Sequence, residues 1–93
     1  MKAAHPRTDD NQKAIVDELR RLGYSVQSLA SVGEGCPDII CGWRGKNYCF
    51  ELKSPGPPSS RRLTPDQLRW HTDWQGQVSV IETVEQALRA MES

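Results

Sequence analysis

Two acids and a lysine stand in a stretch of sequence that otherwise has the character of two short apolar strands. The stretch PDIICGWRGKNYCFELK covers residues 37–53 and holds Asp38, Glu51 and Lys53. Charged side chains are seldom buried without a partner, because the loss of their hydration is costly. Their presence here indicates either an internal ion pair or a chemical site.

A predicted hairpin relates the three charged side chains to one another. Arg44-Gly45-Lys46 separates the two strands and favours a tight turn. If the first two of these residues form the loop, Asp38 lies opposite Glu51. If the last two form it, Asp38 lies opposite Lys53 instead. Either loop places all three on one face of the sheet, because side chains alternate with period two, whereas a three-residue loop without a bulge would not.

Two carboxylates on adjacent strands repel each other, and burial strengthens the repulsion. One solution is structural, with Lys53 neutralising Asp38 and Glu51 as an ion pair. The other is a divalent cation such as Mg²⁺, which takes oxygen ligands and keeps several waters. Its protein ligands would be the two carboxylates and the backbone carbonyl of Leu52. A bound cation acidifies water, and Lys53 is placed to orient that water or to stabilise a developing anion, so the chemistry indicated is phosphodiester hydrolysis.

The surrounding sequence predicts an α/β fold in which a mixed β-sheet is flanked by helices. Helix signals follow Asp9 or Asp10, where an apolar stripe runs to a glycine cap at Gly23. The whole order is helix, three strands, helix, strand, helix (αβββαβα). The predicted strands are 24–29, 37–43, 47–53 and 77–82, the later helices begin at Thr64 and Thr83, residues 1–8 form a flexible N-terminal arm, 54–62 form a mobile loop and 9–93 form a single domain.

Composition excludes several classes of protein. Twelve basic residues balance twelve acidic ones, so net charge gives no argument for polyanion binding. The three cysteines, Cys36, Cys41 and Cys49, fit neither a disulfide framework nor a zinc site, and suit a reducing cytosol. Neither a signal peptide nor a membrane-spanning run is evident. We therefore expect a cytoplasmic protein without a membrane partner, and the family resemblance described next implies a phage or its bacterial host cell.

The residues also resemble those of a known family. Pro37-Asp38 followed by Glu51-Leu52-Lys53 resembles the PD-(D/E)xK nuclease motif. The downstream segment LTPDQLRWHTDWQGQVSVIETVEQAL resembles the VRR-NUC (virus-type replication-repair nuclease) branch, with a glutamine early in a helix, then aromatic residues, a glycine and a valine-rich strand. The resemblance covers roughly residues 10–90 and is strongest to stand-alone phage-type members. It implies a restriction-endonuclease-like core, similar in fold and dimeric form to archaeal-type Holliday junction resolvases.

Carried over by position, the resemblance assigns roles to the motif residues. Asp38 and Glu51 become ligands of Mg²⁺ or Mn²⁺, Lys53 becomes the catalytic lysine, and Gln67 lies near the scissile phosphate. Gln67 equally suits a helix-capping box, and the two roles are compatible. Many relatives carry a metal-binding glutamate in the first helix, whereas the matching face here offers Gln12, next to Asn11. That departure leaves the number of metals open.

Three further groups of residues complete the predicted site. Glu34, between two glycines, is a candidate additional metal ligand or simply a solvated loop acid. Trp70, His71 and Trp74 share a helical face with Gln67, and core packing is the expected role of the tryptophans. Five of the six charged residues between Arg44 and Arg62 are basic. This local basic surface is expected to contact DNA phosphates through Arg44, Lys46, Arg61 and Arg62.

The sequence thus favours a metal-dependent, structure-specific DNA endonuclease, acting on branched DNA as a homodimer. A nuclease of the same mechanism acting on flaps, nicks or linear duplex is the first alternative. A catalytically weak DNA-binding module of the same fold, consistent with the missing helix acid, is the second. A scaffold whose charges form only structural ion pairs is the third.

Overall fold

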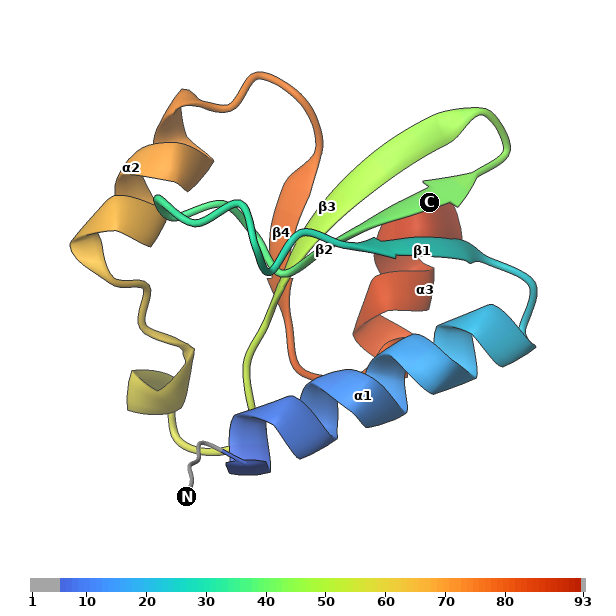
Figure 1. Ribbon diagram of the computed structural model, residues 1–93, viewed down its shortest axis with the longest axis horizontal. Coiled ribbons are helices and arrows are strands. Elements are labelled where there is room, and N and C mark those ends of the chain that lie inside the picture. Colours follow the sequence, from blue (N-terminus) through green and yellow to red (C-terminus); the bar gives the residue numbers. More distant parts are fainter. Residues whose placement is uncertain (1–5, 93) are drawn as a thin grey trace.

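The computed structural model describes residues 6–92, and its elements follow the predicted order (Figure 1). The elements are α1 (Pro6–Arg21), β1 (Ser25–Ser28), β2 (Ile39–Trp43), β3 (Lys46–Leu52), a 3₁₀ helix η1 (Pro58–Arg61), α2 (Pro65–Asp73), β4 (Val78–Ile81) and α3 (Val84–Glu92). The α/β class and the order αβββαβα are confirmed. Within the described residues, none of the helices has the combination of length and apolar character that crossing a bilayer requires.

One mixed sheet holds the four strands in the order β1-β2-β3-β4. Strand β2 pairs antiparallel with both β1 and β3, whereas β4 pairs parallel with β3. A parallel pair needs a crossover connection, and the segment containing η1 and α2 supplies it. The predicted hairpin and crossover are therefore both present.

The hydrophobic core lies between one face of the sheet and helices α1 and α3. Alternate residues of β3, namely Tyr48, Phe50 and Leu52, belong to the core cluster, together with Ile15, Leu19, Tyr24, Ile39, Cys41, Ile81, Ala87 and Met91. The residues between them on β3 point to the opposite face, because strand side chains alternate. Figure 1 shows α2 standing apart from α1 and α3. The core thus occupies one side of the sheet and leaves the other side to α2.

Helix α1 begins at Pro6, earlier than the sequence predicted. Residues 6–8 are therefore helical and do not form a flexible arm, and the remaining arm residues, 1–5, lie outside the described residues. Proline suits a first helical turn, since its missing N–H has no helical partner there. The end of the helix matches the prediction. Gly23 has a φ of 101°, and the N–H of Tyr24 donates to the carbonyl of Leu19 at 3.0 Å, which is a Schellman cap.

The segment 54–62 is more ordered than its composition indicated. Pro58–Arg61 forms the 3₁₀ helix η1. The Ser60 hydroxyl donates to the carbonyl of Pro57 at 2.7 Å, and the Ser60 N–H donates to the same carbonyl at 2.8 Å. Serine side chains commonly stabilise such turns through their own backbone neighbourhood. The prediction of an unstructured loop is therefore wrong for these four residues.

Candidate active site

The β2–β3 turn decides between the two predicted hairpin registers. Arg44 and Gly45 have φ values of 53° and 81°, the left-handed pair that defines a type I′ turn. Trp43 accordingly pairs with Lys46, and the ladder continues to the pair Ile39 and Phe50. The Arg44 guanidinium lies 5.2 Å from the Trp43 ring centroid, a cation–π contact that helps a non-glycine residue occupy the turn. Extending this register by one residue sets Asp38 against Glu51.

Asp38 is fixed by the backbone on both sides. Its carbonyl accepts from the N–H of Leu29 at 2.8 Å, and its N–H donates to the carbonyl of Phe50 at 3.1 Å. One carboxylate oxygen, Oδ2, accepts from the N–H of Leu52 at 2.8 Å. A carboxylate held by a backbone donor has a defined orientation, which is what a ligand group requires.

Among residues 11–92, whose burial the structure describes, Glu51 is the one buried charged residue, with 4% of its surface exposed. Burial, and then the neighbouring charge of Asp38, raise the pKa of Glu51 from 4.5 to about 7. Lys53 opposes this shift only in part, since its Nζ lies 3.8 Å from Glu51 Oε2. Oxygen Oε1 is buried and has no hydrogen-bond partner among residues 6–92. The carboxyl group is therefore only partly compensated in the protein alone.

Gln67 links helix α2 to this carboxyl group. Its Nε2 donates to Glu51 Oε2 at 3.0 Å, and its Oε1 accepts from Lys53 Nζ at 3.4 Å. The same Oε1 accepts from the N–H of Thr64 at 3.0 Å, while the Thr64 hydroxyl accepts from the N–H of Gln67 at 3.2 Å. The capping box and the contact with the site are thus made by one side chain at once, as the sequence allowed.

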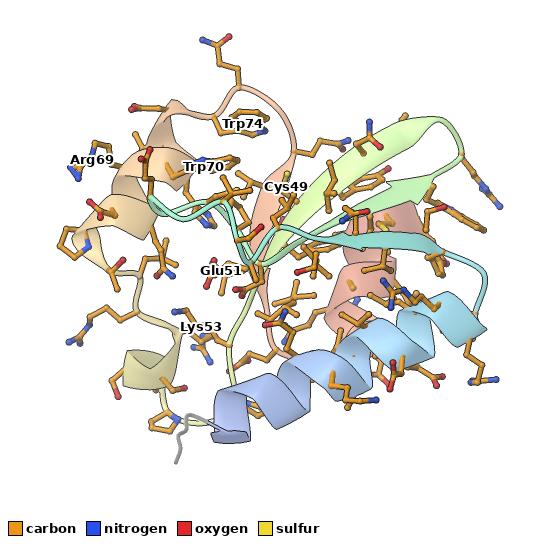
Figure 2. The ribbon with its side chains drawn as sticks, viewed as in Figure 1. Cys49, Glu51, Lys53, Arg69, Trp70 and Trp74 are labelled. Carbon is orange, nitrogen blue, oxygen red and sulfur yellow. The ribbon has the colours of Figure 1, made fainter. Side chains whose placement is uncertain are left out.

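These side chains line one cavity of about 700 Å³ between α2, η1 and the end of β3. Figure 2 shows Glu51 and Lys53 facing the space enclosed by α2 and the chain that leads into it. The lining comprises Asp38, Glu51, Leu52, Lys53, Ser54, Pro55, Ser60 and Gln67. The structure therefore brings together the predicted catalytic residues and Leu52, the predicted backbone ligand.

The candidate on the first helix lies elsewhere. Gln12 lines a separate groove of about 590 Å³, shared with Val16, Arg20 and Ile39 among others. The helix residue that reaches the site strand is Asn11, whose Nδ2 donates to the carbonyl of Lys53 at 3.2 Å. The residue of α1 that contacts the site strand is thus Asn11 and not the predicted Gln12. Adjacent residues point about 100° apart around a helix.

Glu34 is also outside the cavity. It is exposed, has a φ of 58° and lines a groove of about 310 Å³ with Asp66, Arg69 and both tryptophans of α2. A Cβ on the adjacent Gly35 would lie 2.3 Å from the carbonyl oxygen of Asp66, so this glycine lets the loop rest on α2. The loop around Glu34 supports the helix, and the structure assigns Glu34 no contact with Asp38 or Glu51.

The tryptophans of α2 depart from the expected core role. Trp74 is 49% exposed and stacks on Trp70 with ring centroids 4.4 Å apart (Figure 2). Helix α2, described over its whole length, contributes no buried residue. His71, on the same helical face, was not among the residues that the sequence predicted for the site. Its Nε2 is buried without a partner in the described chain, and burial, together with the charge of Lys53, lowers its pKa.

The predicted basic surface is divided between two ends of the molecule. Arg44 and Lys46 lie at the hairpin turn, where β3 begins. Lys53 follows the other end of β3, seven residues along, which is about 23 Å for an extended strand. Arg61 and Arg62 instead follow Ser60 beside the cavity, and Arg61 pairs with Glu82 at 3.3 Å. The four do not form one patch, which corrects the prediction.

The donors at the cavity suit a hard divalent cation. Asp38 and Glu51 supply carboxylates, and the orphaned Oε1 of Glu51 has an unused lone pair in a buried setting. Within residues 6–92 no group of three or more His, Cys, Asp or Glu side chains is placed to hold a metal. Mg²⁺ commonly uses only one or two protein carboxylates and keeps its waters. The residues present therefore fit such an ion.

Comparisons with known proteins agree with this geometry. No family model matches the sequence, and no curated protein matches it. One solved structure, described as a VRR_NUC domain, superposes with a TM-score of 0.68 at 25% sequence identity, covering 91% of this chain and 94% of that chain. The match supports a nuclease of the PD-(D/E)xK type. The resemblance seen in the sequence is thereby confirmed: the chain has a restriction-endonuclease-like fold and is similar to a VRR_NUC domain of known structure.

Proposed function

We propose that this protein is a DNA endonuclease that hydrolyses phosphodiester bonds with the help of Mg²⁺ or Mn²⁺. The observation that carries the proposal is the paired Asp38 and Glu51, with a buried, unpartnered Glu51 oxygen, on a cavity that also holds Lys53. Two carboxylates, one of them buried, are poorly compensated by a single lysine 3.8 Å from Glu51. A divalent cation and a phosphate group would balance the charges.

Each residue has a distinct task in this proposal. Asp38 and Glu51 would hold the cation, with the backbone carbonyl of Leu52 as a third protein donor. The cation would supply a Lewis acid and would lower the pKa of water. The Lys53 ammonium places a positive charge where the transferred phosphoryl group becomes more negative. Gln67 holds Glu51 through its Nε2, so the carboxylate does not have to reorganise when the substrate arrives.

The preferred substrate is proposed to be branched DNA, cut by a homodimer. A four-way junction presents related strands to two active sites, and a two-fold dimer supplies two sites in fixed relation. No described helix presents a set of side chains arranged to read bases, so DNA shape is the expected determinant. Flaps, nicks and linear duplex are the alternative targets of the same chemistry.

The deciding experiment measures cleavage of an end-labelled four-way junction beside a linear duplex of the same arm sequence. Each substrate is incubated with Mg²⁺, with Mn²⁺ or with a chelator, using the unmodified protein, Asp38→Asn and Lys53→Ala. Light scattering after size exclusion determines the oligomeric state. We expect metal-dependent cleavage of the junction by a dimer, lost in both variants. Equal cleavage of the linear duplex would favour the alternative substrates, and metal-independent DNA binding without cleavage would indicate a binding module.

Gln67 offers a prediction that separates its capping role from its contact with the site. Gln67→Glu keeps a good capping-box residue but sets a carboxylate against Glu51. We expect its helix stability to be retained and its cleavage rate to fall at least tenfold, by roughly the 1.4 kcal/mol that one strong contact provides. Gln86→Ala is the matched control, because Gln86 occupies the equivalent position on α3 and its side-chain Oε1 accepts from the N–H of Glu82 at 2.7 Å.

The variant should lose cleavage and keep its stability, whereas the control should lose stability and keep cleavage. Gln86→Ala should lose about 1 kcal/mol of stability, typical for removal of a cap interaction, with its cleavage rate unchanged. Thermal denaturation and single-turnover cleavage are measured on the same samples. Retained cleavage in Gln67→Glu would show that Gln67 does no more than cap its helix. Loss of cleavage in Gln86→Ala would show that cleavage follows helix stability rather than the contact with Glu51.

Arg61 is expected to exchange its partner when DNA binds. In the free protein its guanidinium faces Glu82, whose side chain is 11% exposed, at 3.3 Å. A phosphate must compete with this carboxylate for Arg61. Glu82→Gln should therefore tighten DNA binding about threefold at low salt, within the 0–1 kcal/mol range of surface ion pairs. Fluorescence anisotropy with a labelled duplex in Ca²⁺ is the measurement.

Two further variants make the Arg61 prediction specific. Arg61→Ala should weaken binding, and the double variant with Glu82→Gln should bind no better than Arg61→Ala alone. Arg69→Ala serves as the control, because Arg69 pairs with Asp66 at 2.6 Å on the outer side of α2. Equal tightening by Glu82→Gln with and without Arg61 would mean that only the lost negative charge matters.

A further inference from the structure

Lys53 lies just beyond the last residue of β3, and this position raises the question of what holds it. Strand β3 ends at Leu52, and the chain continues as Ser54-Pro55-Gly56 into the crossover. The ammonium end makes only long contacts, at 3.4 Å to Gln67 Oε1 and 3.8 Å to Glu51 Oε2. Such contacts tolerate displacement, so the position of the ammonium depends on how firmly the Lys53 backbone is held.

Two backbone contacts hold Lys53, and they come from different elements. Its N–H donates to the carbonyl of Ile81 at 2.9 Å, which extends the parallel ladder with β4 by one residue. Its carbonyl accepts from Asn11 Nδ2 at 3.2 Å in a partly buried setting. Asn11 lies 42 residues away in sequence, on α1. The contact with Asn11 is therefore the one that connects the Lys53 carbonyl to α1, the helix that packs on the hydrophobic core.

We propose that Asn11 is a positioning residue of the active site, which acts by clamping the Lys53 backbone. The proposal rests on the nuclease function proposed above. It replaces the expectation that Gln12 supplies the missing helix ligand, since Gln12 lines the groove beside Val16 and Ile39. The side chain needed at position 11 is a hydrogen-bond donor, because its partner is a carbonyl oxygen.

The chemistry of this contact gives a prediction opposite to that of a metal-binding role. Asn11→Asp would bring a carboxylate oxygen against the Lys53 carbonyl oxygen, replacing an attraction with a repulsion. If Asn11 stands in for a metal-binding acid, the same variant adds a ligand and should improve metal use. The direction of change in Asn11→Asp therefore separates the two roles.

The test compares Asn11→Ala, Asn11→Asp and the neighbouring control Gln12→Ala. We expect Asn11→Ala to lower kcat roughly tenfold, as for one lost hydrogen bond of about 1.4 kcal/mol, with little change in KM. Asn11→Asp should lower kcat further, and Gln12→Ala should match the unmodified protein. Alanine is the better helix former, so thermal unfolding of Asn11→Ala should not reveal a loss of fold that mimics this result.

A second readout follows the clamp without using activity. The sequence contains four lysines, so the lysine Cε signals in a ¹H–¹³C spectrum are few, and Lys53→Arg identifies the signal of Lys53. The signal should move in Asn11→Ala and in Asn11→Asp but stay in place in Gln12→Ala. This measurement uses the metal-free protein and remains informative if no DNA substrate is cleaved.

The outcomes separate failure of the clamp from failure of the nuclease proposal. A Lys53 signal unaffected by Asn11→Ala overturns the clamp, as does a kcat unchanged in both Asn11 variants. Higher activity of Asn11→Asp, or activity at lower Mg²⁺ concentrations, overturns the clamp in favour of a ligand role. A moved Lys53 signal in a protein that cleaves nothing would uphold the clamp and contradict the proposed function.

Discussion

Asp38→Asn is expected to abolish metal-dependent cleavage, with a loss of at least about 1,000-fold in the single-turnover rate. The variant keeps an oxygen that can accept from the Leu52 N–H, as Asp38 Oδ2 does at 2.8 Å. The fold should therefore survive. What it removes is one of the two negative charges that hold the cation, and a 1,000-fold loss corresponds to about 4 kcal/mol of transition-state stabilisation.

The control for Asp38→Asn is Asp66→Asn. Asp66 lies in the first turn of α2 and lines the groove with Arg69 and Trp70, outside the cavity. The Asp66→Asn variant should cleave DNA at the rate of the unmodified protein. A rate for Asp38→Asn within tenfold of the unmodified protein would show that the predicted ligand pair is not the centre of the chemistry.

Glu51→Gln should lose cleavage to a similar extent while making the metal-free protein more stable above neutral pH. The pKa of Glu51 in the folded protein is about 7, raised from 4.5 by burial and by Asp38. Between these two values the folded state binds more protons than the unfolded state, so stability falls as pH rises. Above pH 7 the cost of the charge is on the order of 3 kcal/mol, and glutamine does not bear it.

The measurement is urea unfolding across a pH series, in the presence of a chelator. Glu51→Gln and the unmodified protein should differ least in stability below pH 4.5, where the glutamate is mostly protonated in both states, and should separate as pH rises from 4.5 to about 7. Glu85→Gln, in the first turn of α3, controls for the loss of a negative charge. A destabilised Glu51→Gln at pH 8 would contradict the account of an only partly compensated carboxyl group.

Local patterns in the sequence predicted the centre of the site. The period of two along the strands and a tight turn within residues 44–46 suffice to place Asp38, Glu51 and Lys53 on one face, because both are short-range properties of a hairpin. The register that sets Asp38 against Glu51 is decided by the turn in the structure. The Thr64 and Gln67 spacing predicted a capping box, and the structure contains it. That the same Gln67 also reaches Glu51 depends on the crossover, which brings α2 over the sheet.

The predictions that failed depend on distances between elements. Arg44 and Arg62 belong to one basic stretch of the sequence. In the fold, the length of β3 separates the hairpin turn, which carries Arg44, from the cavity. The sequence favours Gln12 over Asn11 because Gln12 is in line with the apolar stripe of the first helix, whereas the contact partner of Asn11 lies 42 residues away. Trp74 is a large apolar residue of the kind expected in a core, yet its exposure depends on where α2 lies above the sheet.

Helix α2 contacts the rest of the domain through the site and through the loop at Gly35. It contributes no buried side chain over residues 65–73, and Gln67 within its first turn contacts both Glu51 and Lys53. Elements with little buried apolar surface open at low free-energy cost, as amide hydrogen exchange detects. Docking of α2 and occupancy of the site are therefore linked equilibria. A ligand that binds Glu51 and Lys53 slows exchange along α2, and by reciprocity a loosened α2 lowers the affinity for that ligand.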